Sequence, residues 1–204
     1  LTEARPASDI KPFKTGEHEP WPEEILNAGL EAEHDRTRLA ISLLYYTGQR
    51  IGDVCAMRWA SIKGGSINLT QQKTAKSLTI PLHSALRAEL ERHGKKGLTL
   101  LTNAVGGPLH PDRLRMELKA LVAEAGHPTL VPNGLRKNAV IALLTAGCSV
   151  AETAAITGQT YQLVEYYARQ IDQERMAEGA ILKLEQSGPR QTVWKTGAEK
   201  GGKA

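Results

Sequence analysis

The sequence has little of what several protein classes require. Its 204 residues include only two cysteines, Cys55 and Cys148, which are far apart and exclude a disulfide-stabilised scaffold or a cysteine-rich zinc motif. No apolar run approaches the ~20 residues that span a bilayer, and no secretory signal pattern opens the chain. These absences predict a cytoplasmic protein with no membrane partner.

Metal and nucleotide sites are equally poorly supported. The six histidines are scattered, with no pair at i,i+4 and no paired carboxylates beside them. No glycine-rich loop precedes a Lys-Ser/Thr pair, so ATP binding is not expected. We therefore expect neither metal nor cofactor. The histidines are His18, His34, His83, His93, His110 and His127.

Composition and charge describe an ordinary globular domain. Hydrophobic residues make up 41% and charged residues 24% of the chain, which suffices for a sizeable core. A net charge of +4 favours a polyanionic partner only weakly. The chain begins at Leu1 rather than Met, as a fragment of a longer protein would.

Changes in proline, glycine and charge content divide the chain into three parts. Residues 1–19 carry two prolines, a glycine and many charges without apolar periodicity, which predicts an extended arm or linker. Residues 20–187 form the expected domain. Residues 188–204 are rich in glycine and lysine and predict a flexible tail.

Within the domain, hydrophobic periodicity predicts an α+β fold that is mainly α. Alternation over 66–70 and 78–80 predicts an antiparallel β-hairpin with a polar connection between the strands. The apolar run 98–101 fits either a third strand or a buried turn. Helical patterns are expected to begin near Pro22 and Arg50 and to cover 37–46, 83–93, 112–125, 134–146, 149–157, 162–170 and 172–186.

Four charged residues have unremarkable explanations when each is taken without its context. Arg50 and Asp53 lie three positions apart on an expected helix, where they could form an ordinary salt bridge. Arg136 lies in the first turn of its helix, where a cation is unfavourable without an anionic partner. Lys73, at the hairpin tip, is by default a solvated lysine.

The order of five segments is more informative than any single residue. In this order and spacing, the chain resembles the catalytic domain of tyrosine recombinases, the phage integrase family, over roughly Pro20 to Gln186. The segments that carry the resemblance are Thr47-Gly48-Gln49-Arg50-Ile51-Gly52-Asp53-Val54, Gln72-Lys73-Thr74-Ala75-Lys76, Gly134-Leu135-Arg136-Lys137, Thr157-Gly158-Gln159 and Glu165-Tyr166-Tyr167-Ala168-Arg169.

The resemblance implies DNA cleavage by a tyrosine that forms a 3′-phosphotyrosyl link, without metal or ATP. Tyr167 matches the nucleophile, because a small and a basic residue follow it. Arg50 and Arg136 match the pair that neutralises the phosphorane, since each guanidinium grips two phosphate oxygens. Lys73 matches the acid that protonates the leaving 5′-oxygen, with Lys76 as a weaker candidate. Asp53 matches the residue that orients the first arginine.

Partners also follow from the resemblance. It implies double-stranded DNA, a homo-tetramer assembled on that DNA, and a bacterial or phage-encoded origin. Family members clamp DNA with a further N-terminal domain, so we expect this chain alone to bind DNA weakly and with steep salt dependence. The apolar residues Met176, Ala180 and Leu184 of the last expected helix fit docking on a neighbouring protomer or packing in cis equally well.

Two positions depart from the family pattern. Asn133 stands where the family usually has histidine, and Gln159 stands where it usually has histidine or tryptophan. Either amide can hydrogen-bond a phosphate oxygen, so both remain candidate catalytic residues, but neither can transfer a proton near pH 7. Asn133 also fits a helix N-cap, and Gln159 could merely close a turn. The gap from Gln159 to Tyr167 is one residue shorter than usual.

Three other functions remain open at the level of sequence. A catalytically weakened recombinase fold would bind DNA without cutting it. Ala154, Gly158 and Val164 lie at helix-turn-helix offsets, which fits a DNA-binding module without chemistry. Type IB topoisomerases share the tyrosine, arginine and lysine chemistry and relax DNA without strand exchange.

Overall fold

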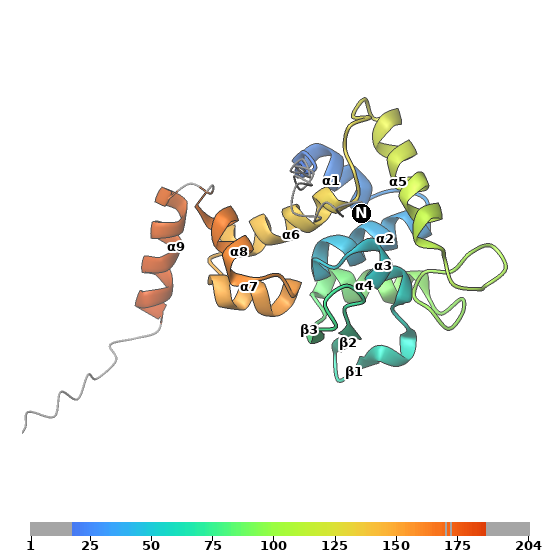
Figure 1. The fold of residues 1–204 in the computed structure, drawn as a ribbon, viewed down its shortest axis with the longest axis horizontal. Helices are drawn as coiled ribbons and strands as arrows, with labels where there is room; N and C mark the ends of the chain where they lie inside the picture. The colour runs from blue at the N-terminus through green and yellow to red at the C-terminus, as the bar shows by residue number, and fades with distance from the viewer. Residues whose placement is uncertain (1–17, 170, 172, 187–204) are drawn as a thin grey trace, which may run out of the picture.

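The computed structural model describes residues 18–169, 171 and 173–186 (Figure 1). The expected arm, apart from His18 and Glu19, and the expected tail lie outside the described residues. A short 3-10 helix, Trp59–Ser61, precedes the first strand. The other elements are α1 (Glu23–Leu30), α2 (Asp35–Thr47), α3 (Ile51–Ala56), β1 (Ile62–Lys63), β2 (Ser66–Thr70), β3 (Ser77–Pro81), α4 (Ser84–His93), α5 (Pro111–Glu124), α6 (Asn133–Thr145), α7 (Val150–Thr157), α8 (Tyr161–Ala168) and α9 (Gln173–Gln186).

The three strands form one antiparallel sheet in the order β1-β2-β3. β2 and β3 are the predicted hairpin, in register with Asn68 opposite Thr79. β1 has only two residues, too few for alternation to reveal it. The run 98–101 is not a strand, because only an isolated bridge joins Thr99 to Arg58. It fits the buried-turn alternative from Thr99 to Leu101, whereas Leu98 is exposed. The mainly helical α+β prediction is confirmed.

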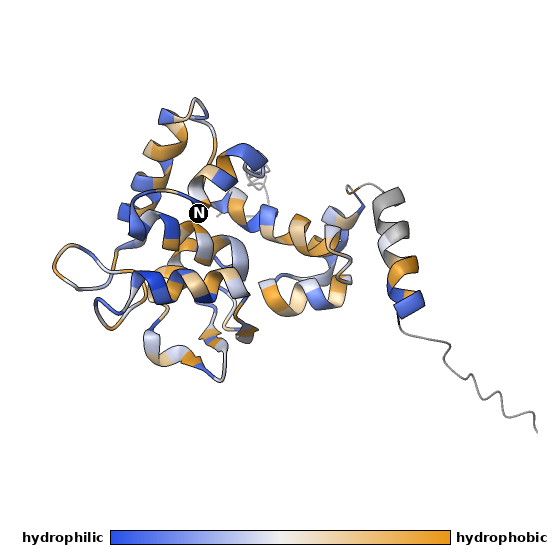
Figure 2. Ribbon diagram, turned by 180° about the vertical axis from the view of Figure 1, so that it is seen from behind, coloured by the Kyte–Doolittle hydropathy of each residue, from blue (hydrophilic) through white to orange (hydrophobic). Residues whose placement is uncertain are grey.

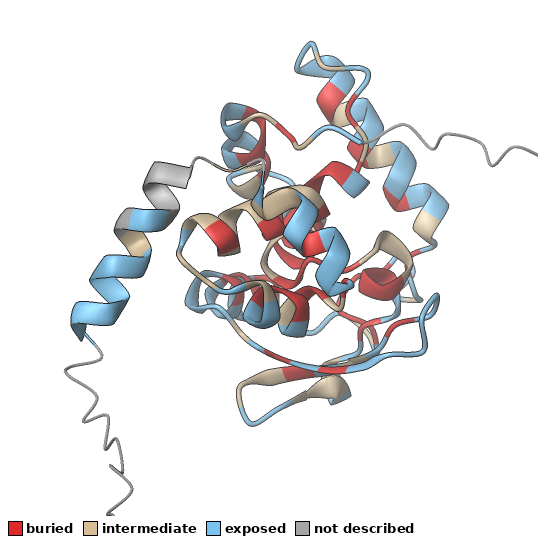
Figure 3. Cartoon of the chain, turned by 60° about the vertical axis from the view of Figure 1, so that its left-hand side comes forward, coloured by how far each residue is buried: buried red, intermediate tan, exposed pale blue. Residues whose placement is uncertain are grey.

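Two apolar clusters hold the helices together. The larger cluster lies among α1 to α5, the sheet and the start of α6. The smaller one joins Val140 and Leu144 of α6 to Ala154 of α7 and Val164 of α8. Figures 2 and 3 show helices with both apolar and hydrophilic residues, and buried residues concentrated in the body of the molecule. Helix α6 therefore connects the two clusters, and its first turns lie between them.

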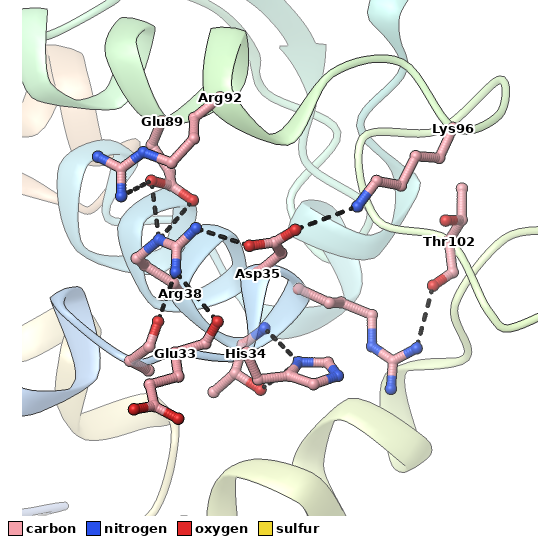
Figure 4. A network of polar contacts seen from close by, with 11 residues as sticks. Glu33, His34, Asp35, Arg38, Glu89, Arg92, Lys96 and Thr102 are labelled. Atoms are coloured by element: carbon pink, nitrogen blue, oxygen red, sulfur yellow. Dashed lines mark hydrogen bonds and ion pairs between the residues drawn. The ribbon is translucent and has the colours of Figure 1, made fainter.

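A buried ion pair joins the start of α2 to α4 (Figure 4). Arg38 Nε donates to both carboxylate oxygens of Glu89, at 2.9 and 3.0 Å. Arg38 also pairs with Asp35, and the Arg38 and Lys96 donors hold the pKa of Asp35 below its usual range. Removing one partner of such a buried pair typically costs about 3–5 kcal/mol, so this network fixes α4 against α2.

Both ends of α7 match the sequence signals. Ser149 and Glu152 form the predicted capping box at the start of α7. Gly158 closes the same helix in the left-handed conformation. No helix in the described ranges is both long and apolar enough to cross a membrane.

Candidate active site

A cavity of about 410 Å³ brings all six predicted catalytic residues together. Two arginines and two lysines line it, and none of its lining residues is acidic. Four cations without a carboxylate among the lining residues favour an anionic ligand. The lining residues are His18, Arg50, Lys73, Asn133, Arg136, Lys137, Gln159, Leu163, Tyr166 and Tyr167.

These residues come from five separate parts of the chain. Arg50 directly precedes α3, and Lys73 lies in the turn between β2 and β3. Arg136 is in the first turns of α6, and Gln159 follows the end of α7. Tyr167 is near the end of α8. Lys76, the weaker candidate for the acid, is exposed and is not one of the lining residues.

The two arginines have buried donors without a partner. Arg136 is 7% exposed, and its Nη2 donates to the carbonyl of Thr157 at 2.9 Å. Its Nε and the Nη1 of Arg50 are buried and make no hydrogen bond. Burial and the nearby Arg50 charge lower the pKa of Arg136 to about 10, so it remains charged at neutral pH. Unpaired buried donors are costly, and an anion in the cavity would satisfy them.

The segment before α1 is anchored to the start of α6. Trp21 donates from its backbone to Asn138 Oδ1 and from its indole to the carbonyl of Val131, both at 2.8 Å. A Cβ at Gly134 would collide with the carbonyl of Glu19, so only glycine permits this approach. The anchor places exposed His18 at the cavity, although the sequence had suggested only a scattered, solvated histidine.

Asn133 is not the N-cap that the sequence suggested. It is the first residue of α6, while Pro132 occupies the N-cap position and there is no side-chain cap hydrogen bond. Pro132 already has helical backbone angles, so the chain enters the helix one residue earlier than expected. The exposed Asn133 side chain lines the cavity instead.

Asp53 does not form the expected ion pair with Arg50 in the described part of the chain. Arg50 lies outside α3 with extended backbone angles, so the i,i+3 helical geometry does not apply to this pair. Asp53 Oδ1 instead accepts from the backbone N–H of Gln72 at 2.8 Å. Its contact is therefore with the hairpin that carries Lys73.

The two adjacent tyrosines occupy different environments. Tyr167 is half-buried and packs on the smaller cluster, whereas Tyr166 is 42% exposed. Leu163, on the same helix, is 41% exposed and lines the cavity. Lys137 Nζ lies 5.1 Å from the centre of the Tyr167 ring, a cation–π contact that the sequence had not indicated. Both tyrosines line the cavity.

Gln159 is 8% exposed and does more than close a turn. Its side chain lines the cavity, and its Oε1 is buried without a hydrogen-bond partner. The glutamine amide carries an NH2 donor and a carbonyl acceptor, and rotation of the amide by 180° exchanges them. This side chain can therefore present either a donor or an acceptor to a ligand. Among the described residues, no three histidines, cysteines or carboxylates are grouped as a metal site.

Comparison with protein families and curated sequences gives consistent results. A model of the phage integrase family matches residues 23–174. The integrase of Escherichia phage HK022 is 30% identical over 100 residues, which are 49% of this chain and 25% of that protein. The integrase of Escherichia phage lambda is 46% identical over 44 residues, 22% of this chain and 12% of that protein. The matches thus span a quarter or less of these relatives.

Solved structures share the fold at low sequence identity. The Tn1549 transposon integrase, in complex with transposon right end DNA, aligns with a TM-score of 0.69 and 16% identity, over 87% of this chain and 69% of that one. XerA recombinase aligns with a TM-score of 0.65 and 17% identity, over 84% and 66%. Lambda integrase residues 75–356 bound to DNA align with a TM-score of 0.63 and 21% identity, over 76% and 62%.

Proposed function

The chain belongs to the phage integrase family, and from this premise we propose that it is the catalytic part of a site-specific recombinase that cuts and rejoins double-stranded DNA. The observation that carries the proposal is the cavity, with four cations, two unpaired buried guanidinium donors and two tyrosines. A phosphodiester supplies the acceptor oxygens that these donors lack. The DNA complexes of the transposon and lambda integrases are similar in fold and support the same partner.

The proposed cleavage step assigns a role to each of the six candidate residues. The Tyr167 oxygen bonds to phosphorus while its hydroxyl proton passes to water, and the bond from phosphorus to the 5′-oxygen breaks. Arg50 and Arg136 stabilise the charge that develops on the non-bridging oxygens. Lys73 gives a proton to the leaving 5′-oxygen, and Asn133 and Gln159 donate hydrogen bonds to the phosphate. The phosphotyrosyl link keeps the energy of the phosphodiester for rejoining.

A covalent adduct is the direct test of this function. A nicked suicide substrate loses the 5′-hydroxyl strand after cleavage, so the protein remains attached to DNA and migrates more slowly on a denaturing gel. The adduct should form in the presence of EDTA and without nucleotide triphosphates. Tight non-covalent binding without any adduct would instead support the weakened recombinase fold, which Asn133 and Gln159 make the second candidate.

Loss of the Lys73 amine should slow cleavage, and a substrate with a better leaving group should restore the rate. Lys73→Ala is expected to lower the single-turnover cleavage rate about 100-fold or more, the usual scale for a general acid. A 5′-bridging phosphorothiolate needs no proton to leave, so it should restore most of the rate. Lys76→Ala is the control on the same turn and should cleave both substrates normally. Absence of rescue would assign Lys73 another role.

Helix α9 fits contact with a second protomer in a DNA-bound tetramer. Of the predicted stripe, Ala180 and Leu184 are exposed, and the side chain of Met176 lies outside the described residues. The large apolar side chains of Ile181, Leu182 and Leu184 are more than half exposed, although the sequence left packing in cis equally open. In Figure 3 the described residues of α9 are mostly drawn as exposed, although the helix contacts α6. Replacing these three residues by serine should leave the melting temperature nearly unchanged but reduce assembly on DNA, measured by native gel. A large fall in melting temperature would favour packing in cis.

A further inference from the structure

A cluster of buried polar groups joins three of the segments that line the cavity. Gln49 directly precedes Arg50, and Gln71 lies two positions before Lys73. Thr157 lies two positions before Gln159. Gln49, Gln71 and Thr157 are each 0% exposed, so their polar groups depend on one another for hydrogen bonds.

Gln71 is the centre of this cluster. Its Nε2 donates to Gln49 Oε1 at 2.6 Å and to the carbonyl of Thr157 at 3.1 Å. Its Oε1 accepts from Thr74 Oγ1 at 2.6 Å. The Gln49 amide in turn donates to the carbonyls of Thr47, at 2.8 Å, and Ile156, at 3.2 Å. The side-chain N–H donors of Gln49 and Gln71 are therefore all hydrogen-bonded within the protein, and no water is needed to satisfy them.

The same carbonyl connects the cluster to the second arginine. The Thr157 carbonyl accepts from Gln71 Nε2 and from Arg136 Nη2. The lysine turn and the arginine are thus hydrogen-bonded to one backbone atom. A Cβ at Gly158, whose φ is +66°, would collide with the Gln71 side chain. Glycine at this position both permits the left-handed turn and leaves room for the amide.

Hydrogen bonds fix the turn that carries Lys73 at residues both before and after the lysine. Gln71 accepts from the backbone N–H of Ala75 at 2.9 Å and contacts Thr74 through its side chain. Gln72 donates to Asp53 Oδ1 at 2.8 Å. Lys73 itself is exposed, so its place over the cavity depends on these anchors.

We propose that Gln71 is a positioning residue that fixes the positions of Lys73 and Arg136 relative to each other on the two sides of the cavity. The proposal rests on the function proposed above, in which Lys73 is the acid and Arg136 the charge-stabilising donor. An acid and a phosphate clamp that share one buried anchor stay in fixed relative positions, and a misplacement of about 1 Å can cost about 100-fold in rate. Gln71 touches neither DNA nor the reacting atoms in this role.

The test replaces Gln71 by methionine, which has similar volume but no amide. Thr99→Val is the matched control, because Thr99 is also buried and donates its hydroxyl to a backbone carbonyl, that of Leu101 at 2.7 Å, but does not line the cavity. We expect Gln71→Met to cleave the ordinary suicide substrate about 10- to 100-fold more slowly than wild type. The 5′-bridging phosphorothiolate should recover the part of the loss that comes from Lys73.

Hydrogen exchange of the full chain provides a second measurement that needs no cleavage. In Gln71→Met, amides of residues 71–76 and 157–159 should exchange faster together, whereas Thr99→Val should leave both segments unchanged. Normal exchange of both segments in Gln71→Met would overturn the proposal. So would a cleavage rate that falls equally on the ordinary and the phosphorothiolate substrate together with a lower melting temperature, because general destabilisation would then explain the loss. If wild type forms no adduct, the proposed function fails, and the exchange result still decides whether Gln71 couples the two segments.

Discussion

Replacing Tyr167 by phenylalanine is expected to abolish the covalent protein–DNA adduct, while Tyr166→Phe still forms it. The change removes one hydroxyl from a half-buried ring that packs on the smaller apolar cluster. Losing one hydrogen-bonding group should lower the free energy of unfolding by only about 1 kcal/mol. Losing the nucleophile leaves no oxygen to bond to phosphorus, so the suicide substrate should give no slowly migrating band.

The adjacent tyrosine is a control within the same helix. The rings of Tyr166 and Tyr167 lie 5.6 Å apart, and both residues line the cavity. The face that Tyr167 shares with Val164 is turned towards the domain, and Lys137 lies over its ring. An adduct that persists in Tyr167→Phe and disappears in Tyr166→Phe would move the nucleophile by one residue. Thermal melting of both variants shows whether either change disturbs the fold.

The sequence predicted the helical fold and the hairpin because these depend on local patterns. Alternation over β2 and β3, the capping box at Ser149 and the glycine that ends α7 are each readable within a few residues. β1 was missed because a strand of two residues has no period. Asn133 was wrongly assigned as an N-cap, because residue preference alone does not reveal that Pro132 already has helical backbone angles.

The candidate site was predictable as a set of residues but not as a set of contacts. The family pattern named six residues that do line one cavity, although their chemical roles remain predictions. The pairing of Arg50 with Asp53 was wrong, because their spacing implied a helix that begins only after Arg50. The contacts of Gln71 with Gln49 and Thr157 join residues 22 and 86 positions apart, which no local pattern can reveal. His18 enters the cavity for the same reason, through the anchor between Trp21 and Asn138.

Removing either arginine should reduce cleavage far more than it reduces stability. We expect Arg136→Ala and Arg50→Ala each to lower the single-turnover cleavage rate by about 100-fold or more, the scale of losing one donor to a developing oxyanion. Arg136 is a buried cation with an unpaired Nε and with Arg50 close enough to lower its pKa to about 10. In the free protein this buried charge has no carboxylate partner among the residues that the structure describes. Its removal should therefore lower the free energy of unfolding only slightly and can even raise it.

Stability and rate together distinguish this role from a structural one. Arg38 is the control, because it is a buried arginine with two carboxylate partners, and Arg38→Ala should lower the melting temperature strongly. Arg136→Ala should melt near or above wild type, apart from the hydrogen bond lost at the Thr157 carbonyl. Addition of inorganic phosphate or vanadate should raise the melting temperature of wild type but not of Arg136→Ala, because the anion satisfies the unpaired donors. An Arg136→Ala variant that melts as early as Arg38→Ala and still forms the adduct would mean that this arginine serves the fold rather than the phosphate.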